Sequence, residues 1–559
     1  MINYKQYIKD KIEKCGFDLN NVEVVRPPKE DMGDFAVPCF TLKIDNANNP
    51  NEKANIIKEK LECDDVISNI EVIGPYLNFT VNKELLGNEV INEINKSNNY
   101  GSSNIGKSKD LLIEHTSINP NASPHIGRCR NSIIGDFLVR LYKFEGYSVE
   151  RHYFVNDIGK QISMLVVGVE KNGNMDTITF KDILELYVKI NEEAATDENI
   201  EKQVFNYLNE LENGNEEIRD KFKKITDLCI NGQREIFDKM DIHWDIFTHE
   251  SDFVFESTTK DILNKLNEKG KLKEDENGRL YVDLTGYNIP TKSPVLVLTR
   301  EDKTSLYPLR DIAYTIYKIN RNSDNNILIL GEDQEVYFKQ IEATLDILGY
   351  KAPKLISYDF VLLDGDKMST REGKLVLLED FIEASINKLK NTFKEKGSDV
   401  SDEVVSTLAA SCIKYCMLNV NRKKTVNFNL ESATDFTGNS AIYLLYNYVR
   451  INSILNKANF KDTNIDKFIF NENEEYSILN SLYDFPDVID GAYKNSESVI
   501  ICNYLYNLCG KFSKYYEKVS ILKENDEMLK ECRLALLNSI KKVLASGMNI
   551  LGIKTIDKF

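Results

Sequence analysis

A histidine and a glycine stand where a short apolar strand gives way to a helix. Leu111–Glu114 reads as a strand, a break rich in Ser, Asn and Pro follows, and His125-Ile126-Gly127-Arg128 opens a helix that stops near Gly146. Such a unit aims unpaired N–H groups and the positive end of the helix dipole at a ligand above the sheet. Gly127 allows close approach and His125 is a donor, so the arrangement suits a nucleoside triphosphate that reacts at phosphorus.

A second motif, Lys367-Met368-Ser369-Thr370-Arg371-Glu372-Gly373, lies far downstream. It follows the strand-like run 360–363 and a turn at 364–366. The motif presents a lysine, a hydroxyl and an arginine together on a loop. Cations on a mobile loop can follow the charge that builds on a leaving pyrophosphate.

Residues 101–108, GSSNIGKS, match the P-loop pattern letter for letter. A P-loop requires a strand before it and a helix after it. Here a helix is expected before it, at 85–94, and a strand after it, at 110–114. The order of helix and strand is the reverse of that in a P-loop, so we interpret the segment as a linker.

Bulk composition is that of a globular chain with several domains. The 559 residues are 42% hydrophobic and 28% charged, and no apolar run reaches membrane-spanning length. Ten cysteines occur without a C-x-x-C pair, and the first residues begin an amphipathic helix rather than a secretory segment. These features favour a reducing cytoplasm. The net charge of −17 argues weakly against a nucleic-acid partner, although a basic groove can coexist with an acidic whole.

The two motifs together resemble the "HIGH" and "KMSKS" signatures of class I aminoacyl-tRNA synthetases. Longer strings are similar to arginyl-tRNA synthetases: EHTSINP at 114–120, RNSIIGD at 130–136, YPLRDIAY at 307–314 and KMSTREG at 367–373. The resemblance covers nearly the whole chain. Arg128 replaces the second His of "HIGH"; because an Arg can donate to phosphate, we expect activity to survive. Thr370 in place of Lys looks usual for this family.

The resemblance implies an α/β fold: a Rossmann-like parallel-sheet catalytic domain over 101–395, with an insertion at about 165–290. It also implies a small tRNA-contacting α+β domain over 1–100 and an all-α stem and anticodon-binding domain over 396–559. In the first domain we expect strands at 22–25 and 76–81, and at 33–38 a turn that leads into a short apolar segment. In the last, five aromatic residues are candidates to stack on bases, although core packing is favoured for most; they are Tyr504, Tyr506, Phe512, Tyr515 and Tyr516.

The implied activity is ATP-dependent ligation of L-arginine to tRNA(Arg) through an arginyl-adenylate, with release of AMP and pyrophosphate. Members typically need bound tRNA even for the first step. Mg²⁺ would accompany ATP as a counter-ion, without a dedicated metal site. We further expect a monomer, located in the cytoplasm, with no membrane partner.

The resemblance assigns ATP binding to both motifs, namely to His125, Gly127, Arg128, Lys367, Met368 and Ser369. Among these, His125, Arg128, Lys367 and Ser369 would act in catalysis. The alternative for Arg128 is a solvated residue of the first turn, but a cation there opposes the helix dipole and requires an anion nearby. The alternative for Lys367 and Ser369 is an exposed turn.

A guanidinium is planar, forked and always charged, so carboxylates should hold it, often with an aromatic ring nearby. The resemblance places this pocket at Glu114, Ser117, Asn119, Tyr307, Asp311 and Gln334. Independently of the family, Glu114 ends an apolar strand, an unusual place for a charge without a partner. Asp311 could instead cap the helix that runs through Ala313. Gln334 could instead belong to an ordinary loop at the N-cap of a helix.

Three other functions compete with this interpretation. A cysteinyl enzyme would be expected to carry a zinc site, for which the Cys and His spacing is wrong. A glutamyl or glutaminyl enzyme would not line its pocket with acids. A non-catalytic tRNA-binding paralogue is favoured only by Arg128, and His125, Lys367 and the pocket acids argue against it.

Overall fold

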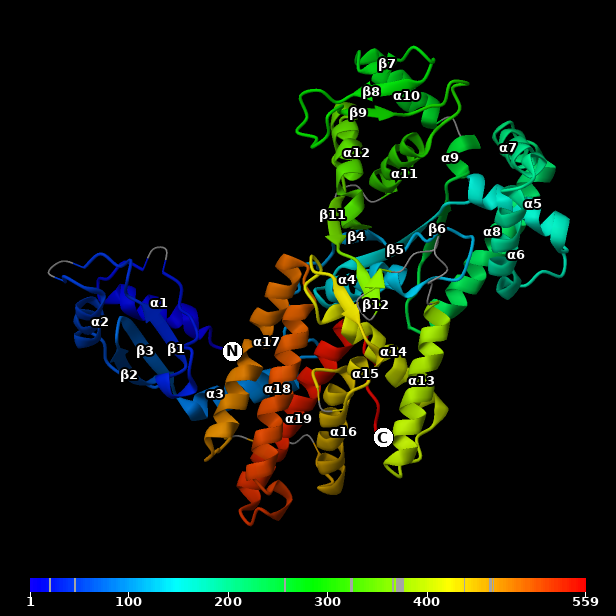
Figure 1. Ribbon diagram of the computed structural model, residues 1–559. Helices are drawn as coiled ribbons and strands as arrows, with labels where there is room; N and C mark the ends of the chain where they lie inside the picture. The colour runs from blue at the N-terminus through cyan, green and yellow to red at the C-terminus, as the bar shows by residue number, and fades with distance from the viewer. Residues whose placement is uncertain are drawn as a thin grey trace.

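The protein is described by a computed structural model that covers residues 1–19, 22–44, 47–255, 258–321, 325–363, 366–367, 377–436, 438–461, 465 and 467–559. Within these ranges the side chains of residues 30, 255, 363, 366 and 367 are not described. Three parts follow one another: a small α+β part, a part built on a parallel sheet, and a helical part (Figure 1). The expected fold class is confirmed.

The N-terminal part is a three-stranded antiparallel sheet with strand order β1-β3-β2. Its elements are α1 (Tyr4–Lys14), η1 (Glu30–Met32), β1 (Phe35–Pro38), α2 (Pro50–Glu59), β2 (Ile67–Ile73) and β3 (Tyr76–Val81). The strand expected at 76–81 is confirmed. The segment 22–25 contributes only an isolated bridge, Val25 with Ala36, whereas the apolar segment expected within 33–38 is present as β1.

Helix α3 (Lys83–Lys96) leads out of this part and packs against two helices of the C-terminal part. The Asn82 side chain caps it by accepting from the backbone N–H groups of Glu84 and Leu85. The chain then turns through 97–108 and enters β4 (Asp110–Glu114). The P-loop-like string therefore lies between a helix and a strand, as expected for a linker.

The central sheet has five parallel strands in the order β11-β10-β4-β5-β6. Its remaining strands are β5 (Ser148–Val155), β6 (Ile246–His249), β10 (Asn326–Gly331) and β11 (Lys354–Tyr358). Helix α4 (Ile126–Phe144) joins β4 to β5, while α11 (Tyr307–Arg321) precedes β10 and η2 (Glu332–Gln334) and α12 (Glu335–Leu348) follow it. The strand order reverses between β4 and β10, which is where open α/β sheets bind ligands.

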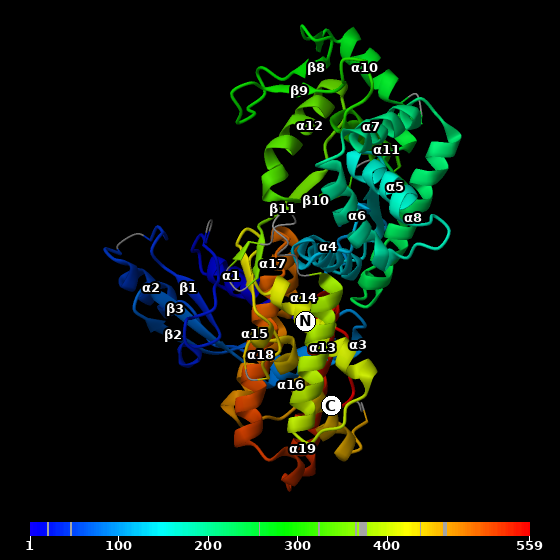
Figure 2. The ribbon, with the colours of Figure 1, turned by 45° about the vertical axis from the view of Figure 1, so that its right-hand side comes forward.

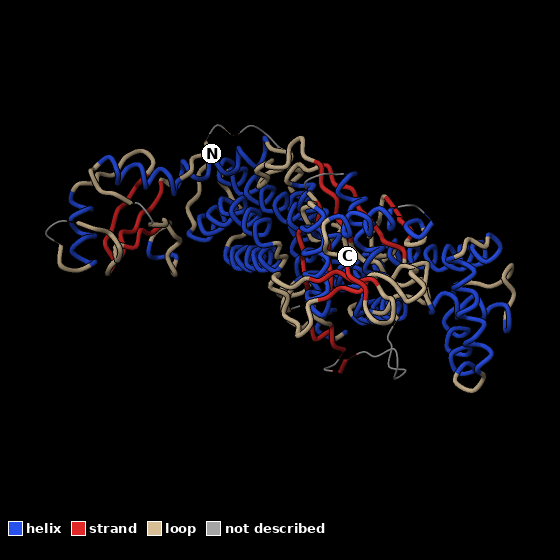
Figure 3. The backbone as a smooth tube through the Cα atoms, turned by 90° about the horizontal axis from the view of Figure 1, so that it is seen from above, coloured by secondary structure: helices blue, strands red, loops and turns tan. Residues whose placement is uncertain are grey.

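Two blocks interrupt this sheet. Helices α5 (Lys160–Asn172), α6 (Phe180–Ala194), α7 (Glu198–Glu212) and α8 (Glu216–Asp238) stand between β5 and β6. After β6 come α9 (Asp252–Phe255), α10 (Thr258–Glu268) and an antiparallel sheet of β7 (Leu272–Glu274), β8 (Leu280–Asp283) and β9 (Val295–Val297). The expected insertion at 165–290 thus spans both blocks and contains β6, a strand of the main sheet. Seen from above, α5–α8 lie at the opposite end of the molecule from the N-terminal sheet (Figure 3).

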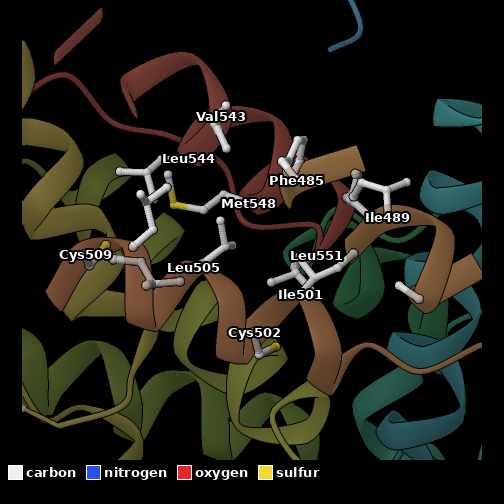
Figure 4. Packing of buried hydrophobic residues seen from close by; sticks show 14 of the residues in the cluster. Phe485, Ile489, Ile501, Cys502, Leu505, Cys509, Val543, Leu544, Met548 and Leu551 are labelled. Atoms are coloured by element: carbon white, nitrogen blue, oxygen red, sulfur yellow. The ribbon is translucent and has the colours of Figure 1, made fainter. Parts of the chain in front are cut away.

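The C-terminal part is a bundle on which α4 rests (Figure 2). Its helices are α13 (Leu378–Glu395), α14 (Asp402–Leu418), α15 (Leu430–Ala433), α16 (Ala441–Lys457), α17 (Asn473–Asn495), α18 (Val499–Lys518), η4 (Ile521–Lys523) and α19 (Glu527–Ile550). Leu505 and Cys509 of α18 pack against Leu544 and Met548 of α19, and all four are buried (Figure 4).

A small sheet joins the central and C-terminal parts. Strands β12 (Val361–Leu363) and β13 (Asp366–Lys367) follow β11, and β14 (Val426–Phe428) lies beyond α14. Strand β12 pairs with β13 in antiparallel fashion and with β14 in parallel. The chain that enters the second motif is therefore attached to the helical part.

Candidate active site

Three neighbouring strands of the central sheet end in carboxylates. Glu114 is the last residue of β4, Asp157 comes shortly after β5, and Glu250 follows β6 directly. Because β4, β5 and β6 are parallel and adjacent, the three side chains stand at one edge of the sheet, and all three are buried. Buried carboxylates require positive partners, so this edge favours a cationic ligand.

Helix α11 adds a fourth carboxylate, that of Asp311. Its Oδ2 accepts a hydrogen bond of 2.5 Å from the Tyr337 hydroxyl on α12. Burial raises the pKa of Asp311 to about 7; the charges of Glu250 and Glu114 act in the same direction and the Tyr337 hydroxyl opposes them. Since Glu114 influences the ionisation of Asp311, the two acids belong to one electrostatic site.

Tyr307 opens α11 one turn before Asp311 and is 57% exposed. Its ring centroid lies 5.5 Å from that of Tyr337. An exposed ring beside a half-buried carboxylate suits a long cationic side chain, whose stem packs on the ring. Because α11 begins at Tyr307, Asp311 lies inside the helix, and the capping alternative for Asp311 is wrong.

Two cations of α11 neutralise part of this acidity. Arg310 Nε lies 2.6 Å from Glu250 Oε1, and both side chains are buried. Lys318 Nζ pairs with the Glu114 carboxylate, so the charge at the end of β4 has a partner within the protein. Among the described residues of the site, four carboxylates thus face two cations. The difference leaves room for the positive charges of a ligand.

The loop after β4 is strained. Thr116 and Ser117 have φ angles of 78° and 43°, a left-handed region that a β-branched residue rarely adopts. Asn131 of α4 secures the loop, because its Oδ1 accepts from Thr116 N at 2.6 Å and its Nδ2 donates to Ile329 O in β10 at 2.9 Å. The Ser117 hydroxyl accepts from Phe154 N at 3.2 Å. These bonds fix the backbone where the strand order reverses.

Asn119 and Gln334 are exposed on the loops after β4 and β10. Asn119 Oδ1 accepts from Asn156 Nδ2, and Asn119 Nδ2 donates to Gln161 Oε1, both at 3.0 Å. Gln334 occupies the N-cap position of α12 but makes no capping bond there, and its amide donates to Asp333 at 2.9 Å. Both amides therefore flank the reversal point within reach of solvent.

His125 occupies the N-cap of α4 and makes no side-chain capping bond. Burial lowers the pKa of His125 to about 4, with the charge of Arg128 acting in the same direction, so the ring is neutral at pH 7. Its Nδ1 is buried without a hydrogen-bond partner in the described part of the chain. Gly127 and Arg128 follow in the first turn, where the exposed Arg128 cation opposes the helix dipole. An anion at this position would satisfy both groups.

Only part of the second motif falls within the described residues. Lys367 belongs to β13, where its backbone pairs with that of Leu362 in β12. Met368 and Ser369, which were expected to bind ATP, lie outside the described residues. The position of Lys367 nevertheless fixes the strand from which the motif departs.

The far flank of the second motif returns to the first. Leu377 forms an antiparallel bridge with His125, and Leu378 N donates to Pro124 O at 2.8 Å. Residues 377 and 378, which follow the second motif in the chain, thus lie beside the turn that opens α4.

Sequence reasoning missed four residues of this site: Asp157, Glu250, Lys318 and Tyr337. Asp157 carries a readable signal, since it follows the apolar end of β5, whereas Glu250 follows the four-residue strand β6, which has no periodicity of its own. Lys318 and Tyr337 lie in helices, and their types and spacing do not distinguish them from other lysines and tyrosines. Their roles follow only from the tertiary contacts.

A separate pocket of about 990 Å³ opens in the helical part. It lies between α16, the end of α18 and the C-terminal residues. Its lining includes the aromatic residues Tyr446, Tyr516 and Phe559 and the basic residues Arg450, Lys457 and Lys558. Rings and cations in one concave surface suit unstacked nucleic-acid bases and their phosphates.

Two of the aromatic residues expected to stack on bases, Phe512 and Tyr515, are fully buried. Tyr504 donates its hydroxyl to the backbone of Ser481. Tyr516 is 41% exposed, lines the pocket, and has the Arg450 guanidinium 5.1 Å from its ring. Tyr506 is partly buried with its ring 5.4 Å from that of Tyr443, so Tyr516 is the most exposed of the five.

The described residues lack two further kinds of feature. They contain no group of three or more His, Cys, Asp or Glu side chains arranged to hold a metal ion. None of the helices they form has the length and apolar character needed to cross a bilayer.

Comparison with known proteins gives consistent matches along the chain. Residues 89–430 match the family described as tRNA synthetases class I (R), catalytic domain; residues 3–81 match the arginyl tRNA synthetase N-terminal domain, and 444–559 the DALR anticodon binding domain. An arginine–tRNA ligase of Halothermothrix orenii is 33% identical over 573 residues, covering 100% of both chains. Another, from Methanocaldococcus jannaschii, is 33% identical over 95% of each chain. The solved Thermus thermophilus arginyl-tRNA synthetase has the same fold, with a TM-score of 0.81 at 22% identity over 99% of this chain and 100% of that one.

Proposed function

The chain belongs to the arginyl-tRNA synthetase family of class I synthetases, and from this we propose how its residues divide the work. The enzyme ligates L-arginine to tRNA(Arg) with ATP, by way of an arginyl-adenylate, and releases AMP and pyrophosphate. The roles of individual residues and domains form our proposal. It is carried by one observation: a surplus of carboxylates lies at the carboxyl edge of β4–β6, on the sheet whose α4 opens with His125.

The arginine side chain enters the acidic edge of the sheet. Asp311 and Glu114 hold the guanidinium, and Lys318 shares the Glu114 carboxylate. Tyr307 packs on the aliphatic stem of the substrate. The polar loops of Ser117, Asn119 and Gln334 surround its α-amino end. Because a guanidinium needs planar bidentate partners, lysine should be a poor substitute.

The triphosphate of ATP lies across the N-terminal end of α4. His125 and Arg128 donate to its oxygens, and Gly127 lets the phosphates approach the helix backbone. Mg²⁺ enters with ATP and shields the β- and γ-phosphates. We assign Lys367, Met368 and Ser369 of the second motif to the same phosphates.

In the first step an arginine carboxylate oxygen attacks the α-phosphorus, and the bond to the pyrophosphate oxygen breaks. Negative charge moves to the leaving pyrophosphate, where Lys367 and Arg128 stabilise it. In the second step the terminal ribose hydroxyl of tRNA attacks the arginyl carbonyl and AMP leaves. Positioning accounts for both steps, and no covalent link to a side chain is required.

The tRNA is held by the parts outside the central sheet. Residues 1–100 contact its body, and the pocket with Tyr516, Arg450 and Phe559 receives anticodon bases. The catalytic domain spans 101–395 and the helical stem with the anticodon-binding domain spans 396–559. The enzyme acts as a monomer in the cytoplasm, which gel filtration and cell fractionation test.

Arginine-dependent ATP–pyrophosphate exchange tests this assignment. The parent should show exchange only when tRNA(Arg) is present, and both Asp311→Ala and Lys367→Ala should abolish it. Asp346→Ala and Lys351→Ala are matched controls, because both side chains are exposed on or near α12, away from the pocket. They should retain the rate of the parent.

Two outcomes would contradict the proposal. Equal exchange with lysine or citrulline would remove the acidic pocket from the mechanism. Retained tRNA binding without any exchange in the parent would indicate a non-catalytic tRNA-binding protein.

A further inference from the structure

Arg130 of α4 is buried with 0% of its surface exposed, and its acceptors among the described residues are all backbone carbonyls. Its Nη1 donates to Asp359 O at 2.5 Å, to Lys424 O at 2.9 Å and to Phe360 O at 3.3 Å. Its Nη2 donates to Asn421 O at 3.2 Å. One guanidinium thus binds two segments that are remote from it in the chain.

The two segments connect different elements of the protein. Residues 359–360 connect β11 to β12, which continues into β13 and Lys367. Residues 421–424 form the turn between α14 and β14. Arg130 itself lies in the helix that begins at His125. Arg130 therefore joins three parts of the protein: the N-terminal end of α4, the segment that leads to the second motif, and the helical part.

The turn and the approach strand are also bonded directly to each other. Asp359 N donates to Arg422 O at 2.9 Å, and Val426 N donates to Phe360 O at 3.0 Å. The Thr425 hydroxyl donates to Asp359 Oδ2 at 2.5 Å. Since these bonds already join the two segments, the contribution of Arg130 is to hold the joined pair against α4.

Arg422 extends the connection into the helical bundle. Its Nη1 donates to Ser357 O in β11 at 2.8 Å, and its Nε lies 3.2 Å from Glu497 Oε1, in the connection between α17 and α18. A displacement of α17 or α18 would therefore be transmitted to the turn that Arg130 holds.

The arrangement is costly if stability is its only purpose. Burial lowers the pKa of Arg130 to about 10, and no carboxylate among the described residues forms an ion pair with it. Its Nε is buried without a partner within the described part of the chain. Apolar residues often replace buried charges with equal or greater stability. Retaining a guanidinium here favours a role in geometry.

We propose that Arg130 is a positioning residue that fixes the approach strand of Lys367 relative to His125 and links both to the tRNA-binding helical part. The inference rests on the proposed function of the two motifs. It predicts that loosening Arg130 impairs the chemistry of adenylate formation and leaves arginine binding intact.

Arg130→Lys tests this directly, because a lysine keeps the charge but cannot donate to four carbonyls. In pyrophosphate exchange with saturating tRNA(Arg), kcat should fall at least about tenfold, since small displacements of reacting groups have large effects. KM for arginine should stay within about twofold of the parent value, as the acidic edge is untouched. Activity of the parent in the same assay establishes the proposed function separately.

Arg533→Lys is the matched control, because Arg533 is an equally buried arginine that binds Glu475 and Glu524 in the helical bundle. It should lower the unfolding temperature without a selective loss of kcat. A kcat loss below about threefold in Arg130→Lys, or parallel losses of kcat and arginine affinity, would overturn the proposal.

Arg130→Gln provides a second route if Arg130→Lys does not fold. It removes the buried charge and leaves at most two donors for the four carbonyls. A kcat reduced by about threefold, with unchanged KM for arginine, supports the proposal; an unchanged kcat overturns it.

Discussion

Replacing Asp311 with asparagine should increase stability while it destroys arginine binding. Burial and the neighbouring acids raise the pKa of Asp311 to about 7. At pH 8 the Asp311 carboxylate is therefore charged in an environment that opposes the charge. Asparagine has nearly the same shape and still accepts the hydrogen bond from Tyr337, but it carries no charge.

The sign and size of the expected stability change follow from the linkage between proton binding and folding. An unfolded chain releases the proton near pH 3.8 and the folded chain near pH 7, so the stability of the parent falls as pH rises through that interval and is level above it. At about 1.4 kcal/mol per pKa unit, the full difference corresponds to about 4 kcal/mol. Because the residue is only half-buried and solvent relaxes around it, we expect Asp311→Asn to gain about 2 kcal/mol at pH 8.

Unfolding midpoints of both proteins at pH 6, 8 and 9, with and without arginine, provide the assay. The stability advantage of Asp311→Asn over the parent should be smaller at pH 6 than at pH 8, and it should be equal at pH 8 and pH 9. Arginine at 100 times its Kd should stabilise the parent by about 2.7 kcal/mol and the variant by much less. The reasoning would be refuted if the variant were less stable than the parent at pH 8, or if arginine stabilised the variant as much as it stabilises the parent.

Three further predictions concern neighbouring features. Lys318→Met leaves the Glu114 carboxylate buried and unpaired, so urea unfolding should show a loss of about 3–5 kcal/mol, with partial recovery when Glu114→Gln is added. Gly135→Ala places a Cβ 2.3 Å from a buried imidazole and should lower the unfolding free energy by about 1–3 kcal/mol, whereas Gly510→Ala, with open space around its Cβ, should not. Tyr516→Ala should raise KM for tRNA about tenfold in aminoacylation assays and leave kcat unchanged.

The helices and strands that carry the first motif were predictable because their signals are local. The strand at 110–114, the helix opening at His125 and the reversed polarity of 101–108 all agree with β4, α4 and α3. Strand β6 was missed because four residues inside a long helical insertion carry no periodicity of their own. Its register is set by β5, about ninety residues earlier.

The acidic pocket was predictable from the family resemblance, and less so from the residues themselves. Glu114 at the end of an apolar strand suggested a ligand, but its ion-pair partner Lys318 lies 204 residues away. No pattern in the sequence distinguishes this pairing from an empty binding site. The excess of carboxylates over cations, which does indicate a cationic ligand, becomes visible only when three strand ends and α11 are brought together.

Helix α4 contacts the loop after β4, the approach to the second motif and the helical part. Its apolar stripe packs into the core, yet its other face is also buried and carries Arg130, Asn131, Ser132 and Asp136. Asn131 and Ser132 hold the strained loop after β4, Arg130 holds the approach to Lys367, and Asp136 lies 3.1 Å from Lys414 of α14. Burying four polar side chains costs free energy unless each is bonded, and their bonds reach the loop after β4, the approach to Lys367 and α14. An apolar replacement of this face would therefore preserve the helix and separate the sites that it aligns.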